Sequence, residues 1–87
     1  MSAQVCVLYF AKSVELTGLK EEEFVAVPTP ISSRDLWRLL LQRHPRLSLL
    51  QHQVVLAVRQ QYVAIGDQVV TLEDGDEVAV VPPLSGG

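Results

Sequence analysis

The sequence predicts a single α+β domain in which a mixed β-sheet carries one main helix on one face. Five segments rich in β-branched and apolar residues read as strands: 5–11, 21–27, 54–58, 62–64 and 77–81. Only the segment between Ser32 and Pro45 has the apolar spacing of a long amphipathic helix. The 87 residues, 48% of them hydrophobic, are enough for one small domain with one modest core.

The first third of the chain predicts two paired strands. Residues 5–11 are continuously apolar, which is typical of a central strand covered on both faces. Residues 12–18 predict a short helical turn that Gly18 closes. Residues 21–27 change from acidic to apolar and end at Pro28, so we expect a second strand that forms a hairpin with the first and begins in water.

The helix has clear start and stop signals. Ser32 is placed to cap it, and Asp35 lies near the positive end of its dipole. The His44-Pro45 pair ends it, because the residue before a proline is disfavoured in the α region. We expect an apolar stripe that faces the core, formed by Leu36, Trp37, Leu39, Leu40 and Leu41. Three arginines are expected to face water, namely Arg34, Arg38 and Arg43.

The second half supplies the remaining strands. Leu47, Leu49 and Leu50 predict an irregular turn packed onto the core, and turns are expected at 66–67 and 74–76. The first and last strands are the most apolar, so they are expected side by side in the middle of the sheet. A hairpin, one helix and further strands in this order resemble the ubiquitin-like β-grasp fold.

Composition and charge exclude several classes of protein. The formal net charge is −3 and the basic residues are scattered, so neither a nucleic-acid groove nor a basic membrane patch is expected. No segment reads as a signal peptide or membrane span. The one cysteine, Cys6, lies in an apolar run and is expected to be a buried, unreactive thiol. These features favour a cytosolic protein of a reducing compartment.

No catalytic apparatus is visible in the sequence. His44 and His52 are expected in surface or capping roles, and they lack metal-ligand spacing with other residues. The acidic turn at 73–77 lacks the ligand spacing of a calcium loop. There is no glycine-rich phosphate loop and no nucleophile motif. We therefore expect the chain itself to bind no cofactor and no metal.

The last six residues carry the one unusual chemical group. We divide the chain into a domain, residues 1–81, and an extended tail, residues 82–87. Pro82 and Pro83 cannot continue a strand ladder and form a stiff exit, while Gly86 and Gly87 have no Cβ and fit a narrow site. The α-carboxylate of Gly87 would be ionised at neutral pH. The alternative is a frayed terminus or an expression-vector remnant.

Four segments resemble a known family: residues 7–11, 15–18, 56–60 and above all 74–87, which end in Pro82-Pro83-Leu84-Ser85-Gly86-Gly87. They are similar to the small, sulfur-carrying subunit of molybdopterin synthase, especially its eukaryotic form. Many bacterial members have an arginine before the glutamate of the first helical turn. This chain has Val14 there, so no role of that arginine can be carried over.

The resemblance implies a sulfur carrier. An E1-like adenylyltransferase and sulfurtransferase would consume ATP to convert the Gly87 carboxylate into an acyl-adenylate and then a thiocarboxylate. The tail would enter the large subunit of the synthase, in a heterotetramer. There it would give sulfur to cyclic pyranopterin monophosphate, and two sulfurs would complete one dithiolene.

Other functions share the same fold and ending. They are a ubiquitin-like protein modifier, a sulfur carrier for thiamine or tRNA thiolation, and an interaction module with an inert tail. The Pro82–Ser85 segment favours the molybdenum pathway. We expect the sheet face opposite the helix to bind the partner, with Phe10, Tyr62 and Val81 at its centre. The alternative for Phe10 is a place in the core.

Overall fold

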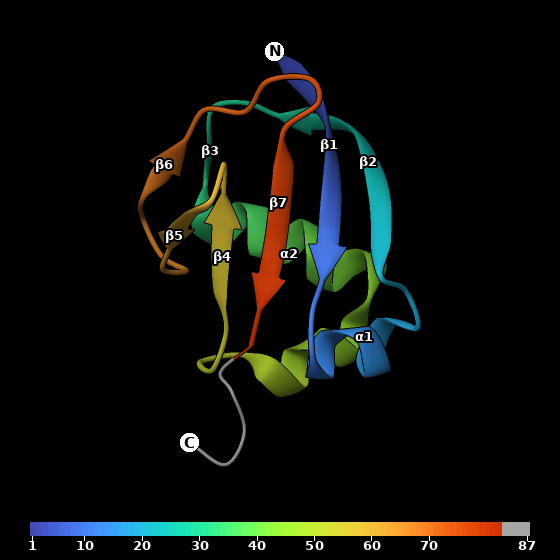
Figure 1. The fold of residues 1–87 in the computed structure, drawn as a ribbon. Coiled ribbons are helices and arrows are strands. Elements are labelled where there is room, and N and C mark those ends of the chain that lie inside the picture. Colours follow the sequence, from blue (N-terminus) through green and yellow to red (C-terminus); the bar gives the residue numbers. More distant parts are fainter. Residues whose placement is uncertain (83–87) are drawn as a thin grey trace.

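The computed structural model describes residues 1–82 (Figure 1). Its elements follow in the order β1 (Ser2–Tyr9), α1 (Lys12–Thr17), β2 (Glu21–Pro28), β3 (Ile31–Ser32), α2 (Ser33–Arg43), the 3₁₀ helix η1 (Pro45–Leu50), β4 (Val55–Val58), β5 (Gln61–Val63), β6 (Val69–Val70) and β7 (Glu77–Val81).

The main sheet is mixed, as predicted. Its strand order is β2-β1-β7-β4-β5, so β7 is the middle strand. β1 and β7 run parallel, and every other neighbouring pair in this sheet is antiparallel. The predicted adjacency of the first and last strands is therefore confirmed. Because β7 has a partner on both sides, the residues that follow Val81 leave from the centre of the sheet (Figure 1).

Helix α2 crosses one face of this sheet (Figure 1). Ser32 caps it as predicted, because the Ser32 hydroxyl oxygen accepts the backbone N–H of Asp35 at 3.1 Å. The helix ends at Arg43, where His44 is the C-cap residue and Pro45 begins η1. The three arginines are exposed, and the apolar side chains that α2 buries deeply are those of Leu36, Trp37 and Leu40.

The core lies between this helix and one face of the sheet. The alternation of buried and accessible residues along β1 places Val5, Val7 and Tyr9 on the core side. The other buried apolar residues are Ala3, Leu16, Phe24, Val27, Ile31, Leu36, Trp37, Leu40, Leu47, Leu50, Val54, Leu56, Val58, Val63, Val70, Leu72, Val78 and Val80. One layer of helix on one layer of sheet accounts for the α+β class.

The burial of β1 and of η1 differs from the expectation. Strand β1 is not covered on both faces: Cys6 and Leu8 are only half-buried, because α2 lies on one face of the sheet and no described residue forms a layer on the other. Leu49 is 67% exposed instead of packed on the core. In a 3₁₀ helix, residues three apart share a side, so Leu47 and Leu50 face inward together and Leu49 does not.

The small sheet formed by β3 and β6 was not predicted. Each strand has two residues, and Ile31 pairs with Val70. The short helix α1 was predicted, and Gly18 ends it in the left-handed region with φ of 77°. β1 and β2 pair as expected, although α1 lies in the connection between them, so they do not form a tight hairpin.

Candidate functional site

The face of the sheet opposite α2 has a continuous row of side-chain positions across all five strands. The register pairs Tyr62 with Ala57, Ala57 with Ala79, Ala79 with Leu8, and Leu8 with Glu21. Paired residues in neighbouring strands lie on the same face of a sheet. We call these five residues the middle row of the open face.

On the side of the middle row toward the end of β7, the open face is apolar. Val55 pairs with Val81, and both are half-buried. Tyr62, which ends the middle row at the β5 edge of the sheet, is 75% exposed. This part of the face is next to the position where the chain leaves β7 toward the tail, so a partner that covers it is also close to the tail.

Phe10 directly follows the end of β1, where Tyr9 pairs with Val80 of β7. Its side chain is 48% exposed and does not belong to the core cluster. The local backbone is held firmly: the buried Ser13 hydroxyl accepts the N–H of Phe10 at 2.8 Å and donates to its carbonyl oxygen at 2.6 Å. Phe10 is therefore an exposed aromatic residue whose backbone is bonded to the Ser13 side chain.

Phe10 and Val81 thus lie near one end of the sheet and Tyr62 in the middle row of the open face, and the binding role of all three stays a prediction. The sequence reasoning did not select their neighbours on the same face, which are Leu8, Val55, Ala57 and Ala79. The alternation of positions within each strand could have indicated that these residues share one face. Which face stays uncovered depends on how the strands pair, and the sequence does not show that pairing. Pro82 is buried, and Pro83, Leu84, Ser85, Gly86 and Gly87 lie outside the described residues.

The other side of the middle row is acidic around one thiol. Cys6 pairs with Glu77 on β7 and with Glu23 on β2. Partial burial, a contact of 3.5 Å between its sulfur and Glu21 Oε2, and the nearby charges of Glu21, Glu77 and Glu23 together raise the pKa of Cys6. The thiol is half-buried instead of buried, and its raised pKa disfavours the reactive thiolate.

Glu22 corrects the expectation that residues 21–23 are simply in water. Its carboxylate accepts hydrogen bonds from Tyr9 at 3.0 Å and Arg43 at 2.9 Å, and it lies 2.7 Å from His44 Nε2. Desolvation raises the pKa of Glu22, but the bonds from His44, Tyr9 and Arg43 outweigh it and lower the pKa overall. The pKa of Tyr9 is raised by burial and by Glu22. This cluster ties the end of α2 to β1 and β2.

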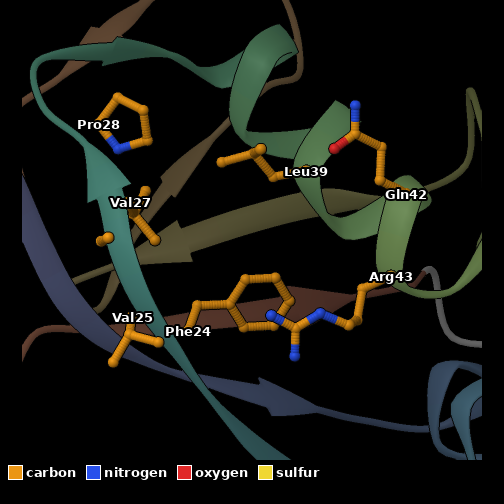
Figure 2. Close-up of a pocket in the computed structure, with 8 residues that line it drawn as sticks. Phe24, Val25, Val27, Pro28, Leu39, Gln42 and Arg43 are labelled. Atoms are coloured by element: carbon orange, nitrogen blue, oxygen red, sulfur yellow. The ribbon is translucent and has the colours of Figure 1, made fainter.

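A hollow lies between β2 and α2 (Figure 2). It is a shallow groove of about 240 Å³, lined mostly by apolar side chains that include Phe24, Val27 and Leu39. The Arg43 guanidinium lies over the Phe24 ring, 4.5 Å from its centroid, as Figure 2 shows. The groove contains no pair of groups suited to acid–base or nucleophilic chemistry. Residues 1–82 also contain no cluster of His, Cys, Asp and Glu that could hold a metal ion.

The fold and the open face define a small β-grasp domain whose middle strand leads to the carboxyl-terminal segment. The model of the ThiS family matches residues 7–87. The chain is 51% identical to the human molybdopterin synthase sulfur carrier subunit, covering 97% of this chain and 94% of that protein. It is 43% identical to the subunit of the same name from Chlamydomonas reinhardtii, covering 97% and 99%.

Solved structures agree with these relatives. A putative molybdopterin converting factor subunit 1 from Pyrococcus furiosus has a TM-score of 0.72 at 33% identity, over 95% of this chain and 100% of that one. The small archaeal modifier protein SAMP1 from Haloferax volcanii has a TM-score of 0.77 at 25% identity, over 98% and 100%. A chain from the complex of subunits 1 and 2 of the molybdopterin-converting factor of Helicobacter pylori has a TM-score of 0.59 at 25% identity, over 97% and 99%.

The chain therefore belongs to the ThiS family and, within it, to the molybdopterin synthase sulfur carrier subunits. No helix among residues 1–82 is long and apolar enough to cross a membrane.

Proposed function

We propose that this chain is the sulfur-carrying subunit of a molybdopterin synthase and that Gly87 carries the sulfur as a thiocarboxylate. The observation that carries the proposal is 51% identity to a curated sulfur carrier subunit along nearly the whole chain, together with the Gly86-Gly87 ending. The human and Chlamydomonas relatives, at 51% and 43% identity, favour this function over a protein modifier or a carrier for thiamine or tRNA thiolation.

The chemistry of the chain agrees with a carrier whose carboxylate is activated by a separate enzyme. A carboxylate is a poor acyl donor, so it must be activated before sulfur can replace one of its oxygens. Residues 1–82 contain no cluster of His, Cys, Asp and Glu that could hold a metal ion for that step. An E1-like adenylyltransferase and sulfurtransferase would form the Gly87 acyl-adenylate, consuming ATP, and would then install the sulfur.

The receiving partner in this proposal is the large subunit of the synthase, in a heterotetramer in the cytosol. The complex of subunits 1 and 2 in the Helicobacter pylori structure supports such a partner. The open face around Phe10, Tyr62 and Val81 would dock on the large subunit, and Pro82, Pro83 and Leu84 would lead onward into it. The prolines reduce the conformational entropy lost when the tail is immobilised. The sulfur would pass to cyclic pyranopterin monophosphate.

The test changes the length of the tail. Deleting Gly87, or adding one residue after it, should abolish dithiolene production, because one extended residue spans about 3.3–3.6 Å and a misplacement of about 1 Å can cost on the order of a hundredfold in rate. Thermal melting should be unchanged, and binding to the large subunit should persist in part. Ser85→Ala, which keeps the length, is the matched control and should still carry sulfur.

Two measurements decide the outcome. Intact mass after incubation with the activating enzyme should show one oxygen-to-sulfur exchange in the wild-type chain and none in the variant that lacks Gly87. Conjugates of high mass would instead indicate a protein modifier. A chain lacking Gly87 that still delivers sulfur at the normal rate would contradict the proposal.

A further inference from the structure

A larger hollow than the groove beside β2 lies against a different side of α2. Its volume is about 620 Å³, within the range of about 300–1,000 Å³ that is usual for small-molecule sites. Its walls come from α2, from the segment 51–55 that leads from η1 into β4, and from residues 64–65 after β5. Helix α2 contributes Arg34, Trp37, Arg38 and Leu41, whose spacing of three and four residues places them on one side of the helix. We call this hollow the Trp37 cavity.

The wall that follows β5 is bonded to the start of α2. The buried Ser33 hydroxyl accepts the N–H of Gly66 at 2.8 Å and donates to the Ala64 carbonyl oxygen at 2.8 Å. The N–H of Arg34 donates to the Gly66 carbonyl oxygen at 3.0 Å. The backbone around Ile65 and the first turn of α2 therefore hold each other in place, so this side of the Trp37 cavity is pre-formed, as ligand sites usually are.

Trp37 brings to the cavity wall a buried donor that has no acceptor. This residue is 3% exposed, and its indole N–H is, among residues 1–82, the one buried side-chain polar group without a hydrogen-bond partner. A donor buried without a partner loses its hydration and gains nothing in exchange. Buried polar groups in native proteins are therefore nearly always paired with protein, water or a ligand. A ligand oxygen in the Trp37 cavity would supply an acceptor.

The Trp37 cavity gathers positive charge on an acidic protein. Its lining includes Arg34, Arg38 and His52 and no aspartate or glutamate, although the formal net charge of the chain is −3. A smaller hollow beside β1 is lined instead by residues that include Glu23 and Asp74. Because opposite charges attract, the lining of the Trp37 cavity favours an anion.

The two arginines can bond to a ligand at small cost. Arg34 pairs with Asp67 at 2.6 Å, and Arg38 pairs with Asp35 at 3.1 Å. All four side chains are more than half exposed, and ion pairs exposed to this degree contribute little to stability. The bonds to the aspartates use Nη1 of each guanidinium, so its other N–H donors remain for an anion.

The charge and the apolar surface of the lining together indicate a phosphate monoester with an apolar body. A guanidinium binds phosphate oxygens through two parallel N–H donors. A phosphate monoester carries a charge of about −1.5 to −2 at pH 7, which matches two arginines better than the single charge of a carboxylate does. Leu41, Val54 and Ile65 supply apolar surface to the same cavity, and this surface suits an aromatic or aliphatic group next to the phosphate.

We propose that the Trp37 cavity binds a small phosphate monoester. The phosphate lies on Arg34 and Arg38, the apolar body lies against Ile65 and the Trp37 ring, and a ligand oxygen accepts the Trp37 indole N–H. The inference does not rest on the proposed function. Because α2 covers the sheet face opposite the open face, most of the cavity wall lies across the sheet from the surface expected to dock on a partner (Figure 1).

The single tryptophan makes the test direct, because the chain gives one indole N–H signal in an NMR spectrum. The wild-type chain is titrated with phenyl phosphate and, separately, with inorganic phosphate and with phenol. We expect phenyl phosphate to shift the indole signal and to bind at least about tenfold more tightly than either of the others, because only the ester meets both the arginines and the apolar wall. Equal binding of inorganic phosphate or of phenol, or an unmoved indole signal, would overturn the proposal.

Two double variants with the same net charge locate the site. Arg34→Gln/Arg38→Gln removes the guanidiniums of the cavity, whereas Lys20→Gln/Arg46→Gln removes two exposed cations that do not line it. Each loses two positive charges, so the formal charge changes from −3 to −5. We expect the first to weaken phenyl phosphate binding about tenfold or more and the control to stay within about twofold of the wild type at about 0.15 M ionic strength. Equal weakening of both variants, or unchanged binding by the first, would contradict the proposal.

Trp37→Phe tests the indole donor itself. Phenylalanine keeps an aromatic ring at the cavity wall and removes the N–H, so we expect phenyl phosphate to bind about three- to tenfold more weakly. Binding at wild-type strength would show that the indole is not part of the site and would overturn the proposal. Thermal melting of each variant confirms folding, and if Trp37→Phe does not fold, the arginine variants and the three titrations decide the outcome.

Discussion

Glu22 shows how one residue can link the stability of this domain to pH. Its side chain is 17% exposed and is bonded to Tyr9, Arg43 and His44, which lower its pKa against the opposing effect of desolvation. A carboxyl group with a lowered pKa in the folded state stabilises the fold above its unfolded pKa of about 4.3. That contribution is lost as the pH falls through the folded value.

We expect Glu22→Gln to lower the free energy of unfolding by about 1–3 kcal/mol at pH 7, because Tyr9, Arg43 and His44 lose a charged acceptor. The deficit should shrink as the pH falls below about 4. Denaturant melts from pH 7 to pH 3 measure it. Glu15→Gln, which breaks only an exposed pair with Lys12, should change stability by less than about 1 kcal/mol. An equal deficit at both pH values would contradict this reasoning.

Cys6 tests whether the chain has a second sulfur chemistry. The sulfur in our proposal is on Gly87, and the raised pKa of Cys6 disfavours its thiolate. Cys6→Ala should therefore leave sulfur transfer largely intact, with a packing cost of about 1 kcal/mol. Dithiolene production with the activating system measures it. Loss of transfer by a well-folded Cys6→Ala variant would show that this thiol takes part.

At the scale of elements, substitutions of the two phenylalanines can distinguish an effect on partner binding from an effect on core packing. Phe10 is half exposed at the end of β1, whereas Phe24 is buried on β2. Phe10→Ser should weaken binding to the large subunit and change stability little. Phe24→Ser should destabilise the domain by about 3–5 kcal/mol, as truncation of a buried aromatic does. Calorimetry and titration of the large subunit measure the two effects. Unfolding by Phe10→Ser would place Phe10 in the core.

Elements with local signals were predictable from sequence, and elements without them were not. The Ser32 cap and the His44-Pro45 stop define α2 almost to the residue. β3 and β6 have two residues each, too few for any periodic pattern, and they form only because the chain brings Ile31 beside Val70. Residues 21–23 are identical glutamates, and only the pleat of β2 and the position of His44 decide that Glu22 alone turns inward.

For the whole molecule, the class of fold and the place of the last strand followed from the apolar patterns of the first and last strands. The residues that make up the open face could not be predicted from these patterns. They depend on the register of five strands, which only the assembled sheet defines. The chemistry predicted for the tail rests on the motif at residues 74–87. The last five residues of that motif lie outside the described structure. The predicted sulfur-carrier family is confirmed by the relatives.

The parallel pairing of β1 and β7 has a mechanical consequence. When a partner grips the tail and pulls, tension enters the domain at Val81 and runs along β7, which is bonded to β1 on one side and β4 on the other. The hydrogen bonds of the antiparallel β4–β7 pair are perpendicular to that tension and those of the parallel β1–β7 pair are slanted across it, so both ladders are loaded in shear. If the chain delivers sulfur as we propose, withdrawal from the partner by the tail would pull on a strand that is bonded on both sides.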